Sequence, residues 1–195
     1  GQGIADLSGI EAGTSLSGLS LPDNRIADLS PLAGLARLQF LDMSRNRVAD
    51  LAPLAALLAL AFLSLGGNPI VDLSPLSRMT RLEALNLDGL GLTGAPELFA
   101  LTRLARLNLN DNEIVDLEGL RGLARLRDLS FSGNPVSAIA PLASLERLTS
   151  LAAGRCAIVD LSPLAGLAEL AEVVVPRNAI ADLSPLLDLP ALRAV

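Results

Sequence analysis

The sequence has no His, Lys, Trp or Tyr, and its four aromatic residues are all Phe. Without His or Lys, it lacks the usual base for a nucleophile and the lysine of Schiff-base and phosphate-binding sites. The single cysteine, Cys156, excludes an intramolecular disulfide and a thiolate metal cage. We therefore expect no catalytic residues, no metal site and no cofactor.

Charge and hydropathy argue against two further classes of protein. All 15 basic residues are Arg and 21 residues are acidic, so a net charge of -6 disfavours nucleic-acid binding. No apolar run reaches the roughly 18 residues of a membrane span, because Pro53 interrupts the longest candidate, residues 51–65. No charged leader opens the chain. One Cys and no N-glycosylation sequon fit a bacterial protein, but they do not separate a cytoplasmic from a surface-exposed one.

The main feature of the chain is an internal repeat of 22 residues. Residues 35–56 align with residues 57–78 without a gap, and the same offset gives eight full units over residues 13–188. Partial units occupy residues 1–12 and 189–195. The pattern is L-x-x-L-x-x-L-x-L-x-x-N-x-I-x-D-L-x-P-L-x-x, and its fourth position is Leu in all nine instances. We interpret residues 1–195 as a single domain of stacked units.

The repeat resembles that of leucine-rich-repeat proteins. Its D-L-S-P-L tail is similar to that of the bacterial internalin-like and SDS22-like subclass, and occurs at residues 28–32, 72–76, 160–164 and 182–186. The resemblance implies an α/β fold: a right-handed solenoid, or horseshoe, with a concave parallel β-sheet and a convex side of 3₁₀ turns and short helices.

The residues of the unit support this fold independently. The L-x-L core alternates with period two and therefore predicts a short strand, with pairs such as Leu41 and Met43 pointing inward. A strand that recurs once per coil pairs in parallel with its counterpart about 4.8 Å away. Because no single unit can bury its own apolar face, the coils stack around one continuous core.

Two polar positions of the unit have structural interpretations. Asn follows the strand in six units, where a buried amide can donate and accept hydrogen bonds at once, and Cys156 occupies this slot as a small buried residue. Asp precedes the P-L tail in seven units, where it can cap a 3₁₀ or helical turn. The fourth unit, residues 79–100, departs most, with Leu90 in the Asn slot and Gly94, Ala95 and Glu97 in the tail. We expect a locally weaker coil there with its register preserved.

The outward strand positions are the predicted binding surface, because function in solenoids belongs to the variable positions of the concave face. Phe40 and Phe62 are one repeat apart and should lie side by side, and exposed aromatics are enriched at interfaces. A polar cluster should lie next to them. The candidate partner-binding residues are Phe40, Phe62, Asp42, Ser64, Asn86, Asp88, Arg106, Asn108, Asn110 and Asp128. A solvated strand face is the alternative interpretation of the polar members, and a sporadic exposed hydrophobic pair is the alternative for Phe40 and Phe62.

Arginines also recur just before the strand, at positions 37, 81, 103, 125 and 147. Evenly spaced arginines can grip phosphate. The acidic residues nearby (Glu83, Asp128, Glu146 and Glu169) and the negative net charge instead favour a solubilising edge.

The sequence therefore favours a non-enzymatic protein-interaction module that binds a macromolecular partner, most simply a protein, on its concave sheet. The alternative is a structural or scaffold repeat segment, excised or engineered, with no specific partner. Neither end shows a polar cap, and an apolar last coil with residues such as Leu192 and Val195 predicts fraying or end-to-end self-association.

Overall fold

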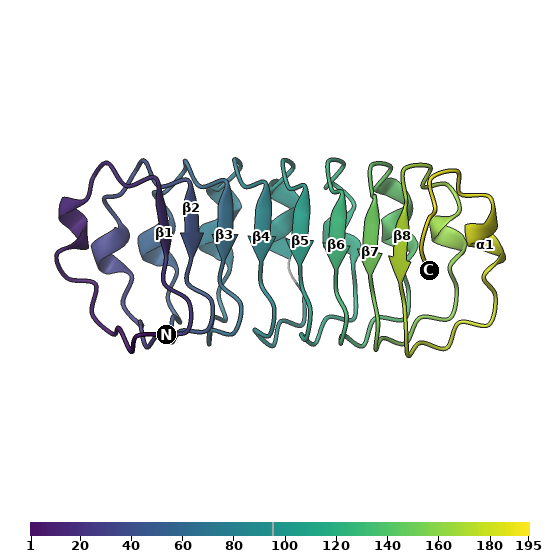
Figure 1. Ribbon diagram of the computed structural model, residues 1–195, viewed down its shortest axis with the longest axis horizontal. Helices are drawn as coiled ribbons and strands as arrows, with labels where there is room; N and C mark the ends of the chain where they lie inside the picture. The colour runs from purple at the N-terminus through teal and green to yellow at the C-terminus, as the bar shows by residue number, and fades with distance from the viewer. Residues whose placement is uncertain (95) are drawn as a thin grey trace.

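The fold is a stack of parallel strands with short helical turns on the opposite side (Figure 1). A computed structural model describes residues 1–94 and 96–195. Paired strands are offset by 22 residues, so that Phe40 lies opposite Phe62 and Leu41 opposite Leu63. The three-residue strands form one sheet in chain order: β1 (Gly18–Ser20), β2 (Phe40–Asp42), β3 (Phe62–Ser64), β4 (Ala84–Asn86), β5 (Arg106–Asn108), β6 (Asp128–Ser130), β7 (Ser150–Ala152) and β8 (Glu172–Val174). The predicted leucine-rich-repeat solenoid is confirmed.

The helical turns lie behind the sheet in Figure 1. Most have Pro at their first or second position, where the missing N–H and the restricted φ are tolerated. The turns are the 3₁₀ helices η1 (Ile10–Ala12), η2 (Ser30–Leu32), η3 (Ala52–Leu54), η4 (Ser74–Arg78), η5 (Pro96–Ala100), η6 (Glu118–Leu120), η7 (Ala140–Ser144) and η8 (Ser162–Leu164), and the α-helix α1 (Ser184–Leu187).

The repeated Asp caps these turns, as predicted. In all seven coils that carry it, one carboxylate oxygen accepts the backbone N–H two residues further on, at 2.8 Å. In six of them that N–H belongs to the first residue of the turn, for example Ser30 of η2 and Ser184 of α1. The arrangement is an Asx turn, which satisfies a donor that has no partner inside the short helix.

The inward leucines form one continuous core between the sheet and the turns. Leu41, Met43 and Leu63 are fully buried, as are the fourth-position leucines from Leu38 to Leu170. Phe131 directly follows β6, points inward at the position that Met43 occupies after β2, and is fully buried as well. Three of the four aromatics remain outside this core.

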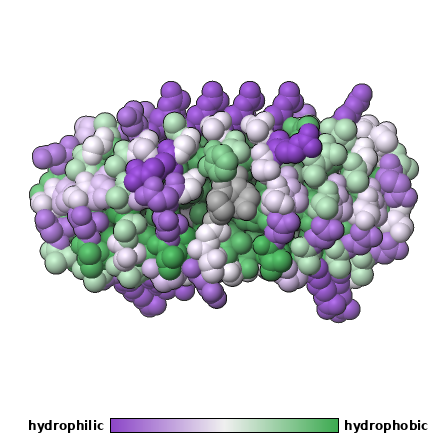
Figure 2. All heavy atoms as spheres, turned by 180° about the vertical axis from the view of Figure 1, so that it is seen from behind, coloured by the Kyte–Doolittle hydropathy of each residue, from purple (hydrophilic) through white to green (hydrophobic). Residues whose placement is uncertain are grey.

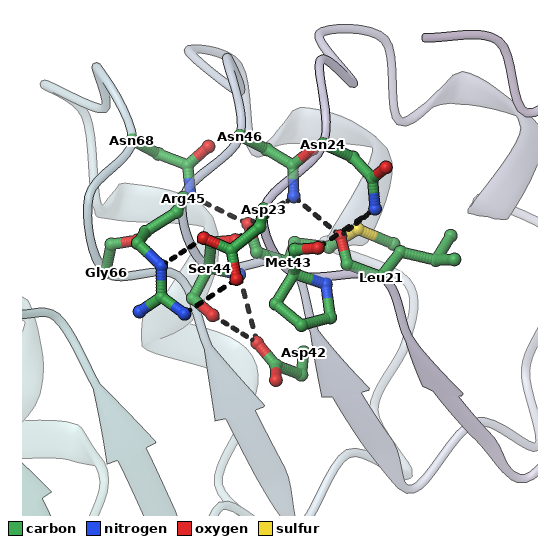
Figure 3. Close-up of polar contacts among 11 residues, drawn as sticks. Leu21, Asp23, Asn24, Asp42, Met43, Ser44, Arg45, Asn46, Gly66 and Asn68 are labelled. Carbon is green, nitrogen blue, oxygen red and sulfur yellow. Dashed lines mark hydrogen bonds and ion pairs between the residues drawn. The ribbon is translucent and has the colours of Figure 1, made fainter. Parts of the chain in front are cut away.

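The Asn slot forms a hydrogen-bond ladder between the coils. Figure 3 shows Asn24, Asn46 and Asn68 in a row along the stack. The Asn68 Nδ2 group donates to the carbonyls of Met43 in the preceding coil (2.9 Å) and Leu65 in its own coil (2.7 Å), and its Oδ1 accepts the Val48 N–H (3.0 Å). The predicted structural role of Asn is therefore confirmed.

The ladder is interrupted at Leu90 and modified at Cys156. The Cys156 thiol donates toward the Phe131 and Gly154 carbonyls at 3.6 and 3.5 Å, reproducing the donor half of an Asn. Neither side chain offers an oxygen to the preceding coil, so the N–H groups of Ile70 and Val136 lose the acceptor that their counterparts have.

The fourth coil keeps its register, as expected. Strand β4 pairs in register with β3 and β5, and Asn112 Oδ1 accepts both the Leu90 and the Leu92 N–H groups at 3.0 Å. Two of the departures, Ala95 and the side chain of Glu97, lie outside the described residues. Leu90 leaves this coil without an Asn of its own, and the local weakness of the coil stays a prediction.

One requirement of the coil was not anticipated from the sequence. The residue before the Asn slot adopts a left-handed backbone in every full unit, with φ between 52° and 75° at residues 23, 45, 67, 89, 111, 133, 155 and 177. Three of these are Gly, which was the available signal. Two ion pairs link charged members of this column. Asp23 pairs with Arg45 one coil away, and Asp111 pairs with Arg155 two coils away.

The last coil continues the pairing of the sheet. The Val173 N–H donates to the Ala194 carbonyl at 3.0 Å, and Glu172 forms a parallel bridge with Ala194.

Candidate functional site

The most distinctive feature of the sheet face is a stacked aromatic pair. Phe40 of β2 and Phe62 of β3 lie opposite each other, with ring centroids 4.3 Å apart and ring planes 9° from parallel. Phe40 is 39% exposed and Phe62 is half-buried. Their side-by-side placement, predicted from the repeat, is thus what the structure shows.

Small residues bound this pair on both sides. Gly18 of β1 lies opposite Phe40, and Ala84 of β4 lies opposite Phe62. Gly18 has no side chain to cover Phe40, the more exposed of the two rings, whereas Ala84 is itself buried beside Phe62. An exposed stack of two aromatics is the kind of surface that protein interfaces cover.

A shallow hollow continues from Phe62 across the next four strands. It has a volume of about 400 Å³, and its lining comes from β3, β4, β5, β6 and β7. The small side chains Ala84, Ser150 and Ala152 make room for it. These three residues occupy outward strand positions but are not among the ten predicted binding residues. Their small size was the available signal.

Two opposite charges line this hollow. Arg106 of β5 and Asp128 of β6 are opposite each other in the sheet and both are exposed. Within the described residues neither takes part in an ion pair; the Asp128 carboxylate only accepts the Thr149 hydroxyl at 3.3 Å. Both charges are therefore available to a partner.

The amide and carboxylate candidates beside the hollow are largely committed to the protein's own backbone. The Asp42 carboxylate accepts the N–H and hydroxyl of Ser44 at 3.0 and 2.7 Å. The Asn108 Oδ1 accepts the Asn110 N–H at 2.9 Å, and the Asn110 Oδ1 accepts the Ser132 N–H at 2.7 Å. These side chains shape the end of the strands, so any partner contact would use their remaining polar atoms.

Ser64 and Asn86 form a pair that changes the expected surface. The Asn86 Nδ2 group donates to the Ser64 hydroxyl at 3.2 Å, while Asn86 Oδ1 accepts the Asp88 N–H at 3.1 Å. Ser64 is only 5% exposed, so of the ten candidates it is the one least able to meet a partner directly.

Asp88 depends on a glycine in the neighbouring coil. A Cβ atom built on Gly66 would lie 2.0 Å from the Asp88 carboxylate, so only Gly allows this half-buried side chain to pack there.

Metal binding, membrane insertion and a reactive thiol are the other functions that we considered for the described residues. They contain no group of three or more side chains able to hold a metal ion, and no helix among them is long and apolar enough to cross a membrane. Partial burial raises the pKa of the Cys156 thiol, as expected for a packing residue.

Comparisons with known proteins identify the family. A family profile described as Leucine Rich repeats (2 copies) matches residues 14–56 and 102–144. The structure of internalin C2 from Listeria monocytogenes is 33% identical in sequence with a TM-score of 0.91, over 95% of this chain and 83% of that one. The chain belongs to the internalin-like leucine-rich-repeat family. No curated protein matched its sequence significantly.

Two further solved structures are similar in fold to this internalin-like protein. Internalin F from Listeria monocytogenes is 32% identical with a TM-score of 0.83, and the match covers 100% of this chain but only 64% of that one. A plant peptide hormone receptor, RGFR1 in complex with RGF2, is 17% identical with a TM-score of 0.74 over 93% of this chain and 36% of that one. The receptor shares the fold alone. The family supports a protein-interaction module in general.

Proposed function

We propose that this internalin-like protein binds a protein partner on the sheet face, with the Phe40–Phe62 stack as its apolar anchor. The stack supports this most directly, because it holds two of the four aromatics of the chain together at the surface. Binding hot spots are typically aromatic or Arg side chains surrounded by less critical contacts.

The hollow beside the stack fits the rest of such an interface. Arg106 and Asp128 can pair with opposite charges on the partner, and Asp42, Asp88, Asn108 and Asn110 can form a polar rim. The role is binding and not catalysis, since the chain has no His or Lys to serve as a base. The competing proposal is a structural repeat segment without a specific partner.

The test is a comparison of captured partners between the wild-type chain and the Phe40→Ser, Phe62→Ser double variant. A matched control is Phe99→Ser, because Phe99 is 65% exposed but belongs to η5, on the opposite side from the sheet. Truncation of a hot spot costs about 2 kcal/mol or more, so a partner should be lost from the double variant and retained by the control.

A thermal melt of each variant shows that it is folded. Partners that are captured equally by the wild type, the double variant and the control would contradict the sheet-face proposal. No partner for any of the three would favour the structural segment.

A further inference from the structure

A charged surface separate from the sheet face lies along one edge of the molecule. It is the edge at which each strand of the sheet begins. Four successive units carry Arg at their third position, and all four side chains are exposed: Arg81, Arg103, Arg125 and Arg147. We call these residues the arginine edge. In Figure 2, evenly spaced hydrophilic side chains project along the upper edge of the molecule, in keeping with this row.

The backbone holds the four arginines in equivalent positions. Each is the third residue of a four-residue turn, closed by a hydrogen bond from Leu82 N–H to Met79 O at 3.0 Å and by its counterparts at 2.9 Å in the next three coils. The first and fourth residues of every one of these turns are fully buried. Two residues further on, the coils are joined by hydrogen bonds of 2.8 Å, such as Ala105 N–H to Glu83 O. The row is therefore built by the core and not by the arginines themselves.

The acidic residues nearby form no ion pair with the four arginines in the described part of the chain. Of the neighbouring acids, Glu169 pairs with Arg127 at 3.4 Å, and Glu83 and Glu146 form no ion pair within the same part of the chain. An ordinary solubilising surface intersperses both signs of charge. Here a chain with a net charge of -6 holds four like charges in a line.

The row is bounded at both ends. The third position is Ala59 in the coil before Arg81 and Glu169 in the coil after Arg147. With coils about 4.8 Å apart, four arginines span roughly 15 Å. Three turns of an α-helix advance about 16 Å, so a helix with one carboxylate per turn matches the row nearly one to one. Alternate side chains of an extended strand are about 6.7 Å apart and do not match this spacing.

We propose that the arginine edge binds an acidic protein segment, in the form of a helix that presents one carboxylate per turn. A protein segment fits better than a nucleic acid because a continuous polyanion would bring far more negative charge against this acidic molecule than four carboxylates do. This surface is separate from the sheet face, so the proposal does not depend on the Phe40–Phe62 anchor.

The test uses fluorescence anisotropy with a labelled helical peptide that carries one Glu per turn on one face over four turns. A scrambled peptide of the same composition distributes its Glu around the helix. The protein variants are Arg103→Gln, Arg125→Gln and a control, Arg37→Gln, Arg193→Gln. The control changes the net charge equally, and Arg37 is an exposed third-position arginine outside the row.

We expect the one-face peptide to bind about tenfold more weakly to the Arg103, Arg125 variant at low salt. The control variant and the Phe40→Ser, Phe62→Ser variant should bind it as the wild type does. Because like charges are removed, the melting temperature of the Arg103, Arg125 variant should be unchanged or higher.

Three results would overturn the proposal. These are equal binding by the two arginine variants, equal binding of the scrambled peptide, and tighter binding of a single-stranded DNA or heparin oligosaccharide than of the peptide. The last would assign the edge to polyanions in general.

Discussion

In most coils of this protein, one Asn side chain forms several hydrogen bonds to the backbone. Asn46, Asn68, Asn112 and Asn134 are buried, and each joins the carbonyls of two strand ends to an N–H of the preceding coil. No smaller polar side chain combines two donors with an acceptor in this way.

Replacement of Asn68 by Ala should therefore destabilise the protein strongly. Two backbone groups, the Val48 N–H and the Leu65 carbonyl, would lose their partner in a buried site, and the Met43 carbonyl would keep only the Asn46 Nδ2 donor. At about 1–3 kcal/mol for a buried polar group left unsatisfied, we expect a loss of at least 2 kcal/mol in urea unfolding. Asn108→Ala is the surface control, with a loss of about 1 kcal/mol or less. Equal losses would argue against the ladder as a source of stability.

The Cys156 slot allows the opposite experiment. Its thiol reproduces the donor bonds of Asn weakly, and the Val136 N–H lacks an oxygen acceptor. Cys156→Asn should restore that bond and raise the free energy of unfolding by about 0.5–1.5 kcal/mol. Cys156→Ser, with a shorter side chain, is the comparison. A destabilised Asn variant would mean that the seventh coil has adapted to the smaller residue.

At the scale of the element, the short helical turns depend on the carboxylates that precede them. The backbone N–H and then the hydroxyl of Ser74 lower the pKa of Asp72 from its usual value near 3.8, and Ser162 acts in the same way on Asp160. Hydrogen bonds from Ser likewise lower the pKa of Asp6, Asp28 and Asp182.

The direction of these shifts predicts sensitivity to acid. A carboxyl group with a lower pKa in the folded state stabilises the fold above the unfolded pKa, and this contribution is lost as the pH falls below about 4. The urea midpoint should therefore decrease between pH 5 and pH 2.

Asp72→Asn, Asp160→Asn provides the control for this prediction. Asn keeps an oxygen that can accept the same N–H but carries no charge, so its urea midpoint should fall less steeply with acid. An unchanged slope in the double variant would place the acid sensitivity elsewhere.

At the scale of the whole molecule, the core is a stack whose inner coils cover one another and whose outer coils are covered on one side. Leu170 and Val173 are fully buried in the coil of β8, whereas the equivalent Leu192 is half-buried and Val195 is 65% exposed. The same contrast holds at the other end, where Leu16 and Leu19 are half-buried.

We therefore expect the 195-residue chain to self-associate through these terminal coils as its concentration rises. Val195→Glu should weaken the association by placing a charge on the exposed core position. Leu187→Glu is the matched control, because Leu187 is 78% exposed but belongs to α1 on the side away from the sheet. Light scattering after size-exclusion chromatography measures the effect. A monomer at every concentration, or equal weakening by both variants, would contradict it.

Much of this fold was predictable because the same 22-residue pattern of apolar and polar positions recurs in every coil. The leucine rows, the strand register that brings Phe40 to Phe62, the Asn slot and the Asp turns all follow from burial and hydrogen bonding at a fixed period. The left-handed backbone position before the Asn was missed. Gly67 and Gly133 indicate it, but Asp23, Arg45 and Arg177 occupy the same position in other coils and do not suggest a positive φ.

The periodic sequence was sufficient to predict which residues face the core, because apolar rows spaced by one coil have a single way to become buried together. Which surface groups stay free required the coordinates, since this depends on side-chain contacts between coils. Asn86 covers Ser64, and Arg155 reaches Asp111 across Gly133, where any Cβ atom would lie 2.4 Å from that carboxylate. A long side chain can form contacts of similar energy with several partners, and the sequence pattern alone does not determine which contact forms.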